Sequence, residues 1–232
     1  MRIAIMVLVL LLCGTSGEPA FADSSSGWQA YLDGRYAAAL RDLKPLAEAG
    51  NADAEYALGT MYSQGRGVLR DARMAAHWYE QAARQGHVEA SFSLGFLLFY
   101  GVGSDGQATP PDPAAGLPWI EAAATHGNAA AQYFLGAAYW VGNGVETNRE
   151  TALRWTLLAA EQGITDAQYQ AGMILATERG VDNAVAAYQW LELAARAGHP
   201  SAARQREQLA AARLTAAEVR RAQALADAWH RP

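Results

Sequence analysis

A segment of about 36 residues recurs four times in this chain, and no other feature limits the fold so strongly. The copies occupy residues 51–86, 87–127, 128–163 and 164–198 and are 36, 41, 36 and 35 residues long. Repeats of this length are typical of solenoids, in which each copy buries its apolar face against the next copy. The sequence therefore predicts a stack of similar units.

Two sets of recurring positions indicate two helices in each copy. In the first half of the third copy, Tyr133 is followed three residues later by Gly136 and six residues later by Tyr139. Spacings of three and four residues place side chains on one face of a helix, and a glycine allows a neighbouring helix to come close. The second half contains Trp155, followed four residues later by an alanine pair. These positions predict an all-α unit of helix, turn, helix and turn.

Glycines mark the turn between the two helices. Three copies have a Gly-x-Gly doublet, at residues 65–67, 101–103 and 142–144, and the fourth copy retains only Gly180. A phosphate-binding glycine loop normally follows a strand, whereas these glycines follow a helix, so we interpret them as helix terminators. An Asx residue that can cap the second helix comes next in each copy: Asp71, Asp112, Asn148 and Asn183.

Together these positions give the pattern A-x-Y-x-L-G-x-x-Y-x-x-G-x-G-V-x-x-[DN]-x-x-x-A-x-x-W-x-x-x-A-A-x-x-G, which resembles the Sel-like repeat, a relative of the tetratricopeptide repeat. The resemblance implies a right-handed α/α superhelix (solenoid) with a concave inner face. Bacterial members of the family commonly assemble envelope complexes, regulate sensor kinases from the periplasmic side, or contact host proteins. The third copy carries almost every position of the pattern: Tyr133, Leu135, Gly136, Tyr139, Gly142, Gly144, Val145, Asn148, Ala152, Trp155, Ala159, Ala160 and Gly163.

The segments on either side of the repeats are predicted to be caps, because the end units of a solenoid would otherwise expose apolar faces. Residues 23–50 are expected to form a capping helix pair broken at Gly34, and residues 199–232 to form capping helices. Thr215 and Glu218 have the spacing of a capping box. The last helix has an apolar stripe of Val219, Ala222, Ala226 and Trp229, and we expect a solvated side that carries the arginines at positions 204, 206, 213, 220 and 221.

Residues 1–22 are predicted to be a signal peptide, with cleavage between Ala22 and Asp23. We do not expect a lipid anchor at Cys13, because Leu12 is too large for the residue that precedes a lipoprotein cysteine. Cys13 is the only cysteine, so the mature chain would have no disulfide, cysteine nucleophile or thiolate metal site. We expect an exported protein, periplasmic or secreted.

The charge and hydropathy of the chain exclude several kinds of partner. The formal net charge is −5, whereas nucleic acids and anionic membranes require a basic face. After the signal peptide, no apolar run approaches the length needed to span a bilayer. The partner is therefore predicted to be a protein of the envelope or of a signalling system, with contact to the cell wall as a second prospect.

The second copy departs from the pattern in its turn and second helix. An insertion occupies Ser104–Pro113, Gly116 replaces the usual alanine, and Pro118 precedes Trp119. A proline at this depth removes a backbone hydrogen bond, so the helix is predicted to start late or to be kinked. The inserted loop is interpreted either as part of a binding face or as drift in a tolerant turn.

Aromatic residues replace small or polar ones in the first helices of the second and third copies. These residues, which we predict to contact a partner, are Phe96, Phe99, Tyr100 and Trp140. Phe99 and Trp140 occupy the same position of the repeat and are expected to be adjacent, since neighbouring repeats stack in parallel. A helix that is apolar on every side is either buried or presents an apolar face. The alternative is that the N-terminal cap or the inserted loop covers this face.

No catalytic, cofactor-binding or metal-binding residue is predicted. The five histidines, at positions 77, 87, 126, 199 and 230, lack the spacing of a zinc site, and the common catalytic motifs are absent from the sequence. We therefore predict a non-catalytic protein–protein interaction scaffold or adaptor of the bacterial cell envelope, with its partner on the concave face of the solenoid. The alternatives are an envelope protein that binds peptidoglycan or polysaccharide, and a hydrolase of the β-lactamase-like kind reported for cysteine-rich relatives, whose paired cysteines this chain lacks.

Overall fold

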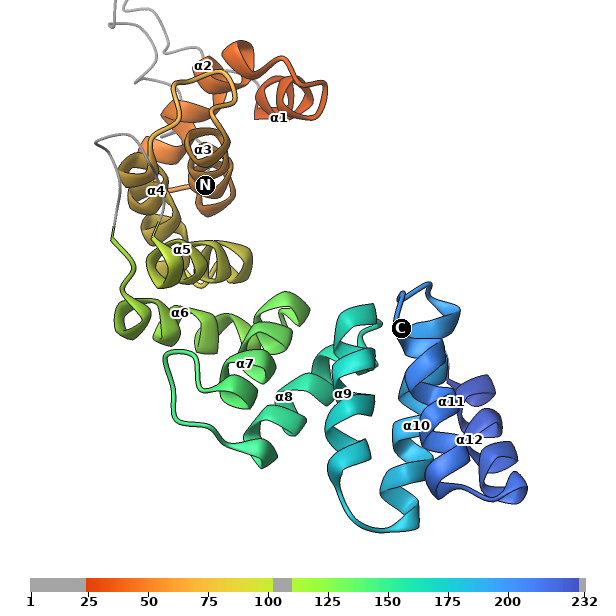
Figure 1. Ribbon diagram of the computed structural model, residues 1–232. Coiled ribbons are helices and arrows are strands. Elements are labelled where there is room, and N and C mark those ends of the chain that lie inside the picture. Colours follow the sequence, from red (N-terminus) through yellow and green to blue (C-terminus); the bar gives the residue numbers. More distant parts are fainter. Residues whose placement is uncertain (1–23, 102–109, 230–232) are drawn as a thin grey trace, which may run out of the picture.

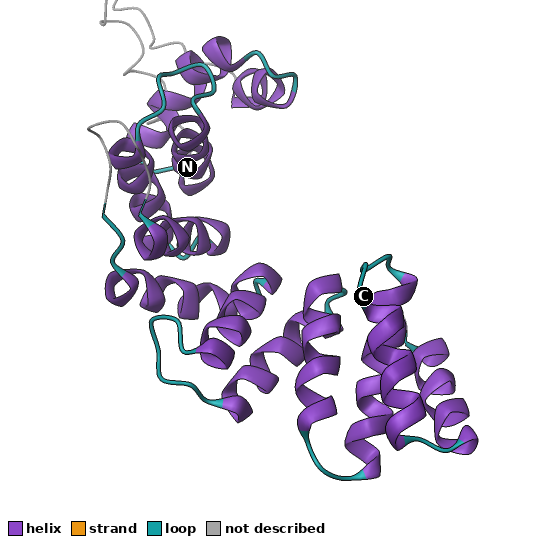
Figure 2. Ribbon diagram, in the orientation of Figure 1, coloured by secondary structure: helices purple, strands orange, loops and turns teal. Residues whose placement is uncertain are grey.

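The computed structural model describes residues 24–101 and 110–229 and is all-α, with twelve helices in these ranges. Consecutive helices form pairs that follow one another along a curved arc (Figures 1 and 2). The predicted signal peptide, Cys13, and residues 102–109 of the inserted loop lie outside the described residues. The helices are α1 Ser24–Leu32, α2 Tyr36–Glu48, α3 Ala52–Gln64, α4 Ala72–Arg84, α5 Val88–Tyr100, α6 Pro113–Thr125, α7 Ala129–Val141, α8 Arg149–Glu161, α9 Thr165–Thr177, α10 Val181–Arg196, α11 Ala202–Arg213 and α12 Ala216–Ala228.

The predicted caps of the second helices are confirmed in the first three repeats. Asp71, Asp112 and Asn148 each accept a hydrogen bond from a first-turn backbone N–H, at 2.9–3.0 Å. Gly65 and Gly142 end α3 and α7 in the left-handed conformation, with φ of +69° and +77°. Local sequence thus sets both ends of the turn, as the glycine and Asx spacing predicts.

The cap predicted at Asn183 is wrong. Gly180 occupies the N-cap position of α10, which begins at Val181, so Asn183 lies inside the first turn. Its Nδ2 donates to the carbonyl of Arg179 at 2.8 Å instead of the side chain accepting from the helix. The physical reason is the shorter turn of the fourth repeat, which has one glycine where the others have two and brings the chain into α10 early.

The late start predicted for the second helix of repeat 2 is also wrong. Asp112 caps α6, which begins at Pro113 and continues through Pro118. Both Pro118 and Ala114, whose carbonyl would have accepted the missing hydrogen bond, are exposed, so water can replace the lost donor. Gly116 brings α5 and α6 together: a Cβ on Gly116 would lie 2.5 Å from the carbonyl oxygen of Gly95.

The recurring glycine of each first helix faces the residue after the tryptophan of the second helix. A Cβ on Gly95 would lie 2.6 Å from Cγ1 of Ile120, and one on Gly172 would lie 2.7 Å from Cγ of Leu191. Real Cβ atoms essentially never come this close to another heavy atom, so a larger residue at either position would force the facing side chain or the helix to shift. The same relation joins Gly59 to Tyr79 and Gly136 to Thr156.

Buried polar side chains join the two helices of a repeat. Glu55 and Gln132 occupy equivalent buried positions in α3 and α7. Gln85 Nε2 donates to Glu55 Oε2, and Gln162 Nε2 donates to Gln132 Oε1, each at 2.7 Å. Each bond links a first helix to the end of the second helix of the same repeat, where the chain turns into the next copy. Buried polar groups are thereby satisfied within the repeat.

The C-terminal helices cover the fourth repeat. The capping box of Thr215 and Glu218 is confirmed, and Ala222 and Ala226 are buried in the core cluster around α9 and α10. Arg213 and Arg221 are exposed as predicted, whereas Arg206 is largely buried; all three also contact the repeats. Arg206 pairs with Glu192, Arg213 donates to the carbonyls of Ala176 and Glu178, and Arg221 pairs with Asp182 at 2.8 Å.

Candidate partner-binding surface

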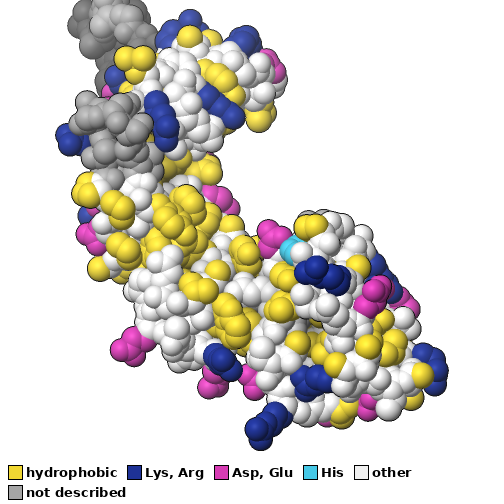
Figure 3. Space-filling view, in the orientation of Figure 1, with side chains coloured by type: hydrophobic (Ala, Val, Ile, Leu, Met, Phe, Trp, Pro, Cys, Tyr) yellow, Lys and Arg dark blue, Asp and Glu magenta, His cyan; other side chains and the backbone are white. Residues whose placement is uncertain are grey.

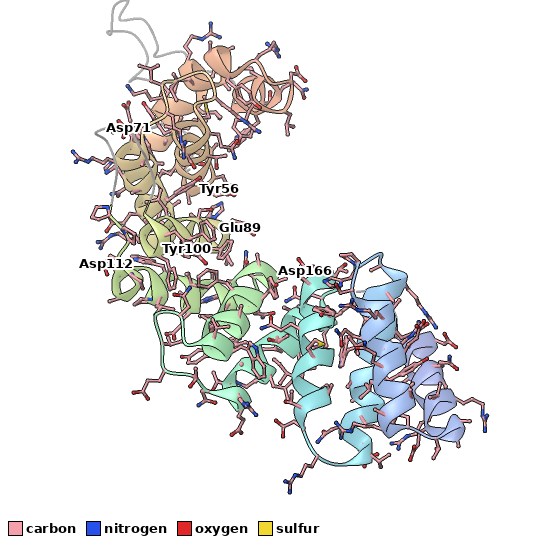
Figure 4. The ribbon with its side chains drawn as sticks, in the orientation of Figure 1. Tyr56, Asp71, Glu89, Tyr100, Asp112 and Asp166 are labelled. Atoms are coloured by element: carbon pink, nitrogen blue, oxygen red, sulfur yellow. The ribbon has the colours of Figure 1, made fainter. Side chains whose placement is uncertain are left out.

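The first helices of the four repeats, α3, α5, α7 and α9, share one surface, which we call the A face. Figure 4 places Tyr56, Glu89 and Asp166, all from these helices, on the inner side of the arc. It places Asp71 and Asp112, which cap second helices, on the outer side. The N-terminal parts of these first helices therefore line the inner side of the arc.

Five aromatic rings from α5 and α7 form a cluster on the A face. Phe96 lies at its centre, with ring centroids 6.0 Å from Phe92, 4.9 Å from Tyr100 and 6.1 Å from Phe134. Phe96 is 45% exposed and Tyr100 is 48% exposed. Figure 3 shows hydrophobic side chains gathered over α5 and continuing toward α7. We call Phe92, Phe96, Phe99, Tyr100 and Phe134 the aromatic cluster.

Phe99 lies at the base of this cluster and is only 2% exposed, so it is not part of the exposed surface that Phe96 and Tyr100 form. Its ring centroid is 4.9 Å from that of Phe134 and 5.0 Å from that of Tyr100. Two glycines account for its depth. A Cβ on Gly116 would lie 3.0 Å from Cβ of Phe99, and one on Gly144 would lie 2.9 Å from its Cε2. Phe99 thus fills space that these glycines leave open.

Trp140 occupies the same repeat position as Phe99 but has different surroundings. Among the described residues, no ring contact joins the two. Trp140 is half-buried, and the guanidinium of Arg149 lies 5.5 Å from its ring centroid. The second helix of this repeat has Ala152 where α6 has Gly116, so the space that admits Phe99 is occupied by a methyl group. The four candidate residues therefore divide between two features of the A face.

Trp140 lines a groove of about 490 Å³ between α7 and α9. Tyr133 and Ala137 line it from α7, and Tyr169 and Met173 from α9. The rest of the lining is polar and consists of Asp166, Gln170, Thr177 and His199.

An Asp–Tyr–His arrangement occurs twice on the A face. His199 stacks on Tyr169 with ring centroids 4.0 Å apart, and its Nε2 lies 3.7 Å from Oδ1 of Asp166. His87 stands in the same relation to Tyr56 and Asp53, at 4.6 Å and 3.4 Å. Each histidine comes directly after the repeat that supplies the tyrosine and the aspartate. The arrangement therefore joins the start of one unit to the first helix of the preceding repeat.

The hydrogen bonds of these histidines hold the backbone in place and indicate a structural role. The Nδ1 of His87 accepts a hydrogen bond from the backbone N–H of Ala90 and so caps α5. The Nδ1 of His199 accepts from the backbone N–H of Ser201. In the described part of the chain, no three His, Cys, Asp or Glu side chains are grouped so that they could hold a metal ion.

Sequence reasoning overlooked Phe134, Tyr169 and His199. Phe134 directly precedes the recurring Leu135 and is an aromatic residue at a position where the pattern has none, which is the signal that also marks Phe96. Tyr169 stands at the recurring aromatic position of the fourth copy, equivalent to Tyr133, and this position by itself indicates only packing within the repeat. His199 follows the closing glycine of the fourth repeat as His87 follows that of the first, so their shared position could have revealed the paired arrangement.

The fold and the A face define a helical-repeat protein. Four consecutive segments, residues 52–87, 88–128, 129–164 and 165–199, match the Sel1 repeat, and the chain belongs to this family. No catalytic family is identified. Across residues 24–101 and 110–229, no helix has both the length and the apolar character needed to cross a membrane.

Relatives and solved structures agree with this assignment. The exopolysaccharide production negative regulator of Rhizobium leguminosarum bv. viciae is 29% identical over 182 residues, which cover 76% of this chain and 56% of the regulator. The structure of c5321, a protective antigen of uropathogenic Escherichia coli with an SLR fold, superposes with a TM-score of 0.71 at 28% identity over 90% of this chain and 45% of the antigen. A Sel1 repeat protein from Oxalobacter formigenes gives a TM-score of 0.64 at 33% identity over 74% and 49% of the two chains. The chain thus spans about half the length of these proteins.

Proposed function

We propose that this protein is a non-catalytic scaffold or adaptor of the bacterial cell envelope that binds a protein partner through the A face, on the concave side of the arc. The observation that carries the proposal is the aromatic cluster. Phe96 and Tyr100 are nearly half exposed; Tyr100 lies against the buried ring of Phe99, and Phe96 lies against Tyr100 and Phe134. Aromatic side chains held in place by a packed base are typical of the residues that dominate binding energy at protein interfaces.

The chemistry of the cluster favours an apolar protein segment as its occupant. Four of the five side chains are phenylalanines, and only Tyr100 brings a hydrogen-bonding group. Full burial of an exposed phenylalanine side chain is worth about 1.5–3 kcal/mol. Phe96 and Tyr100 are already about half buried, so covering both supplies roughly 1.5–3 kcal/mol in total, against the roughly 8 kcal/mol of a micromolar affinity. Sel1 repeats typically mediate protein interactions, which agrees with this assignment.

Export of the chain belongs to the same proposal. It rests on the signal-peptide pattern of residues 1–22 and on the likeness to a regulator of exopolysaccharide production. A partner in the envelope follows from that location.

Site-specific crosslinking in intact cells tests the proposal. A photo-crosslinking phenylalanine analogue at position 96 is expected to give one discrete protein adduct, which Tyr100→Ser reduces at least fivefold. The matched control is the same analogue at Leu158, a 38% exposed apolar residue of the second helix α8. An adduct of equal yield from position 158, or one that Tyr100→Ser leaves unchanged, refutes the use of the A face.

A second candidate function is the binding of envelope polysaccharide, favoured by the aromatic groove at Trp140 and by the name of the Rhizobium relative. Cosedimentation with cell-wall sacculi or isolated exopolysaccharide separates the two candidates. A polysaccharide binder sediments with the polymer and loses this property in Trp140→Ala. An adaptor remains in the supernatant and gives the position-96 adduct.

A further inference from the structure

The groove between α7 and α9 differs in character from the aromatic cluster, although both lie on the A face. Three aromatic rings line it: Tyr133 and Trp140 from α7, and Tyr169 from α9. The groove therefore combines π faces with the polar groups of Asp166 and Gln170. Such a mixture of apolar walls and a few polar groups is the usual composition of a ligand site.

Gln170 contributes a hydrogen-bond acceptor that is unpaired among the described residues. Its Oε1 is buried, and none of the described residues donates to it. A buried acceptor without a partner costs about 1–3 kcal/mol, and native structures contain few of them. Because Gln170 lines the groove, a ligand that brings an N–H or O–H donor into the groove can satisfy this oxygen.

The other polar groups give the groove a negative character. The carboxylate of Asp166 stands at the groove with its side chain 65% exposed. Burial raises the pKa of Tyr133, and the negative charge of Asp166 raises it further. The carboxylate of Asp166 is therefore close enough for its charge to act on the phenol of Tyr133. No lysine or arginine is among the residues that line the groove, and His199 approaches Asp166 only to 3.7 Å.

We propose that this groove binds a basic side chain, an arginine above all, presented by a protein partner. The inference rests on the proposed function and specifies the chemistry of the partner. A guanidinium is planar and always charged, so it can stack on Trp140 or Tyr169 while its N–H groups reach Asp166 and Gln170. The guanidinium of Arg149 already lies 5.5 Å from the ring centroid of Trp140 without lining the groove.

The charge of the whole chain points the same way. Its formal net charge is −5, so a basic segment is attracted over long range before it docks. A neutral sugar would also stack on the rings, but it would gain nothing from the charge of Asp166. Replacing that charge without changing the shape of the side chain therefore separates the two ligand chemistries.

Titration followed by ¹H–¹⁵N NMR tests the assignment on the full mature chain. The probe is Nα-acetyl-L-arginine amide, compared with the uncharged isostere Nα-acetyl-L-citrulline amide. We expect the arginine probe to shift the side-chain amide of Gln170 and the indole N–H of Trp140 with millimolar affinity. The citrulline probe should bind about three- to fivefold more weakly, because an ion pair with an exposed carboxylate is worth up to about 1 kcal/mol. Asp166→Asn should weaken the arginine probe by a similar factor.

The matched control is Glu146→Gln, which removes one negative charge from an exposed loop position away from the groove. It should leave the affinity for the arginine probe within twofold. Three results would each overturn the proposal. The two probes could bind equally, or Asp166→Asn could leave binding of the arginine probe unchanged. The third is that cellohexaose, but not the arginine probe, shifts the signals of Gln170 and Trp140. The position-96 crosslink does not depend on Asp166, so failure here is distinguishable from failure of the adaptor function.

Discussion

The contact between α5 and α6 leads to a quantitative prediction for Gly95→Ala. An added Cβ would lie 2.6 Å from Cγ1 of Ile120, 2.8 Å from the carbonyl oxygen of Gly116 and 2.9 Å from the backbone nitrogen of Ile120. Two of these three atoms belong to the backbone of α6. A side-chain rotation therefore cannot relieve the clash, and the two helices must move apart.

The expected change in the free energy of unfolding is the sum of two opposing effects. Alanine is favoured over glycine inside a helix by roughly 1 kcal/mol, which stabilises the variant. Overpacking costs roughly 1–3 kcal/mol, and we expect the upper part of this range because backbone atoms are involved. The net result is a loss of roughly 1.5 kcal/mol, which for a chain of this size lowers Tm by about 3–6 °C.

Gly172→Ala is the matched comparison. There the two nearest atoms are Cγ and Cδ2 of the Leu191 side chain, at 2.7 and 3.0 Å, and the one backbone atom nearby, the carbonyl oxygen of Ala187, is farther away at 3.1 Å. Urea unfolding followed by far-UV circular dichroism should show a clearly smaller loss for Gly172→Ala than for Gly95→Ala. The reasoning fails if Gly95→Ala stabilises the protein, as helix propensity alone would predict, or if the two variants lose the same amount.

Two buried carboxylates should make stability depend on pH in opposite ways. Burial raises the pKa of Glu55, although the hydrogen bond from Gln85 lowers it. The stability that protonated Glu55 contributes is therefore present at acidic pH and is lost as pH rises through the folded-state pKa. Glu55→Gln should be more stable than the natural chain by roughly 1 kcal/mol at pH 7, and thermal melts should show this gain vanishing near pH 4. Burial also raises the pKa of Glu192, but hydrogen bonds from Arg196 and Arg206 outweigh it and leave the pKa lowered, so its contribution is present at neutral pH and lost as pH falls through the folded-state pKa. Glu192→Gln should cost roughly 2 kcal/mol at pH 7, less than a fully buried pair because both arginines are partly exposed, and calorimetry should show this deficit disappearing at strongly acidic pH.

The sequence was sufficient to predict the helices, because the residues that define each repeat act within one or two turns of helix. Asp71 caps the helix that follows it, and Gly142 ends the helix that precedes it, whatever lies farther away. Asn183 was misassigned because the same reasoning assumed a turn of constant length, while the fourth turn is shorter and Gly180 takes the N-cap position.

Exposure within the candidate surface could not be predicted in the same way. Phe99 and Trp140 share a repeat position, but Phe99 is buried because Gly116 and Gly144 leave room for it, and these glycines come from two other segments. The groove acceptor Gln170 is likewise defined by its neighbours and has no signature of its own in the sequence. The position of a residue in the repeat predicts which way its side chain points, whereas the size of the residues that face it determines how deeply the side chain is buried.

Phe99 belongs both to the aromatic cluster and to the boundary between the second and third repeats. Its ring supports Tyr100 on one side and lies against Gly144, in the turn of the following repeat, on the other. The curvature of a solenoid is the sum of small rotations between neighbouring repeats, and this boundary sets one of them. The same buried ring therefore supports the exposed aromatic surface and helps to set the angle between two repeats, so a change at Phe99 should alter both.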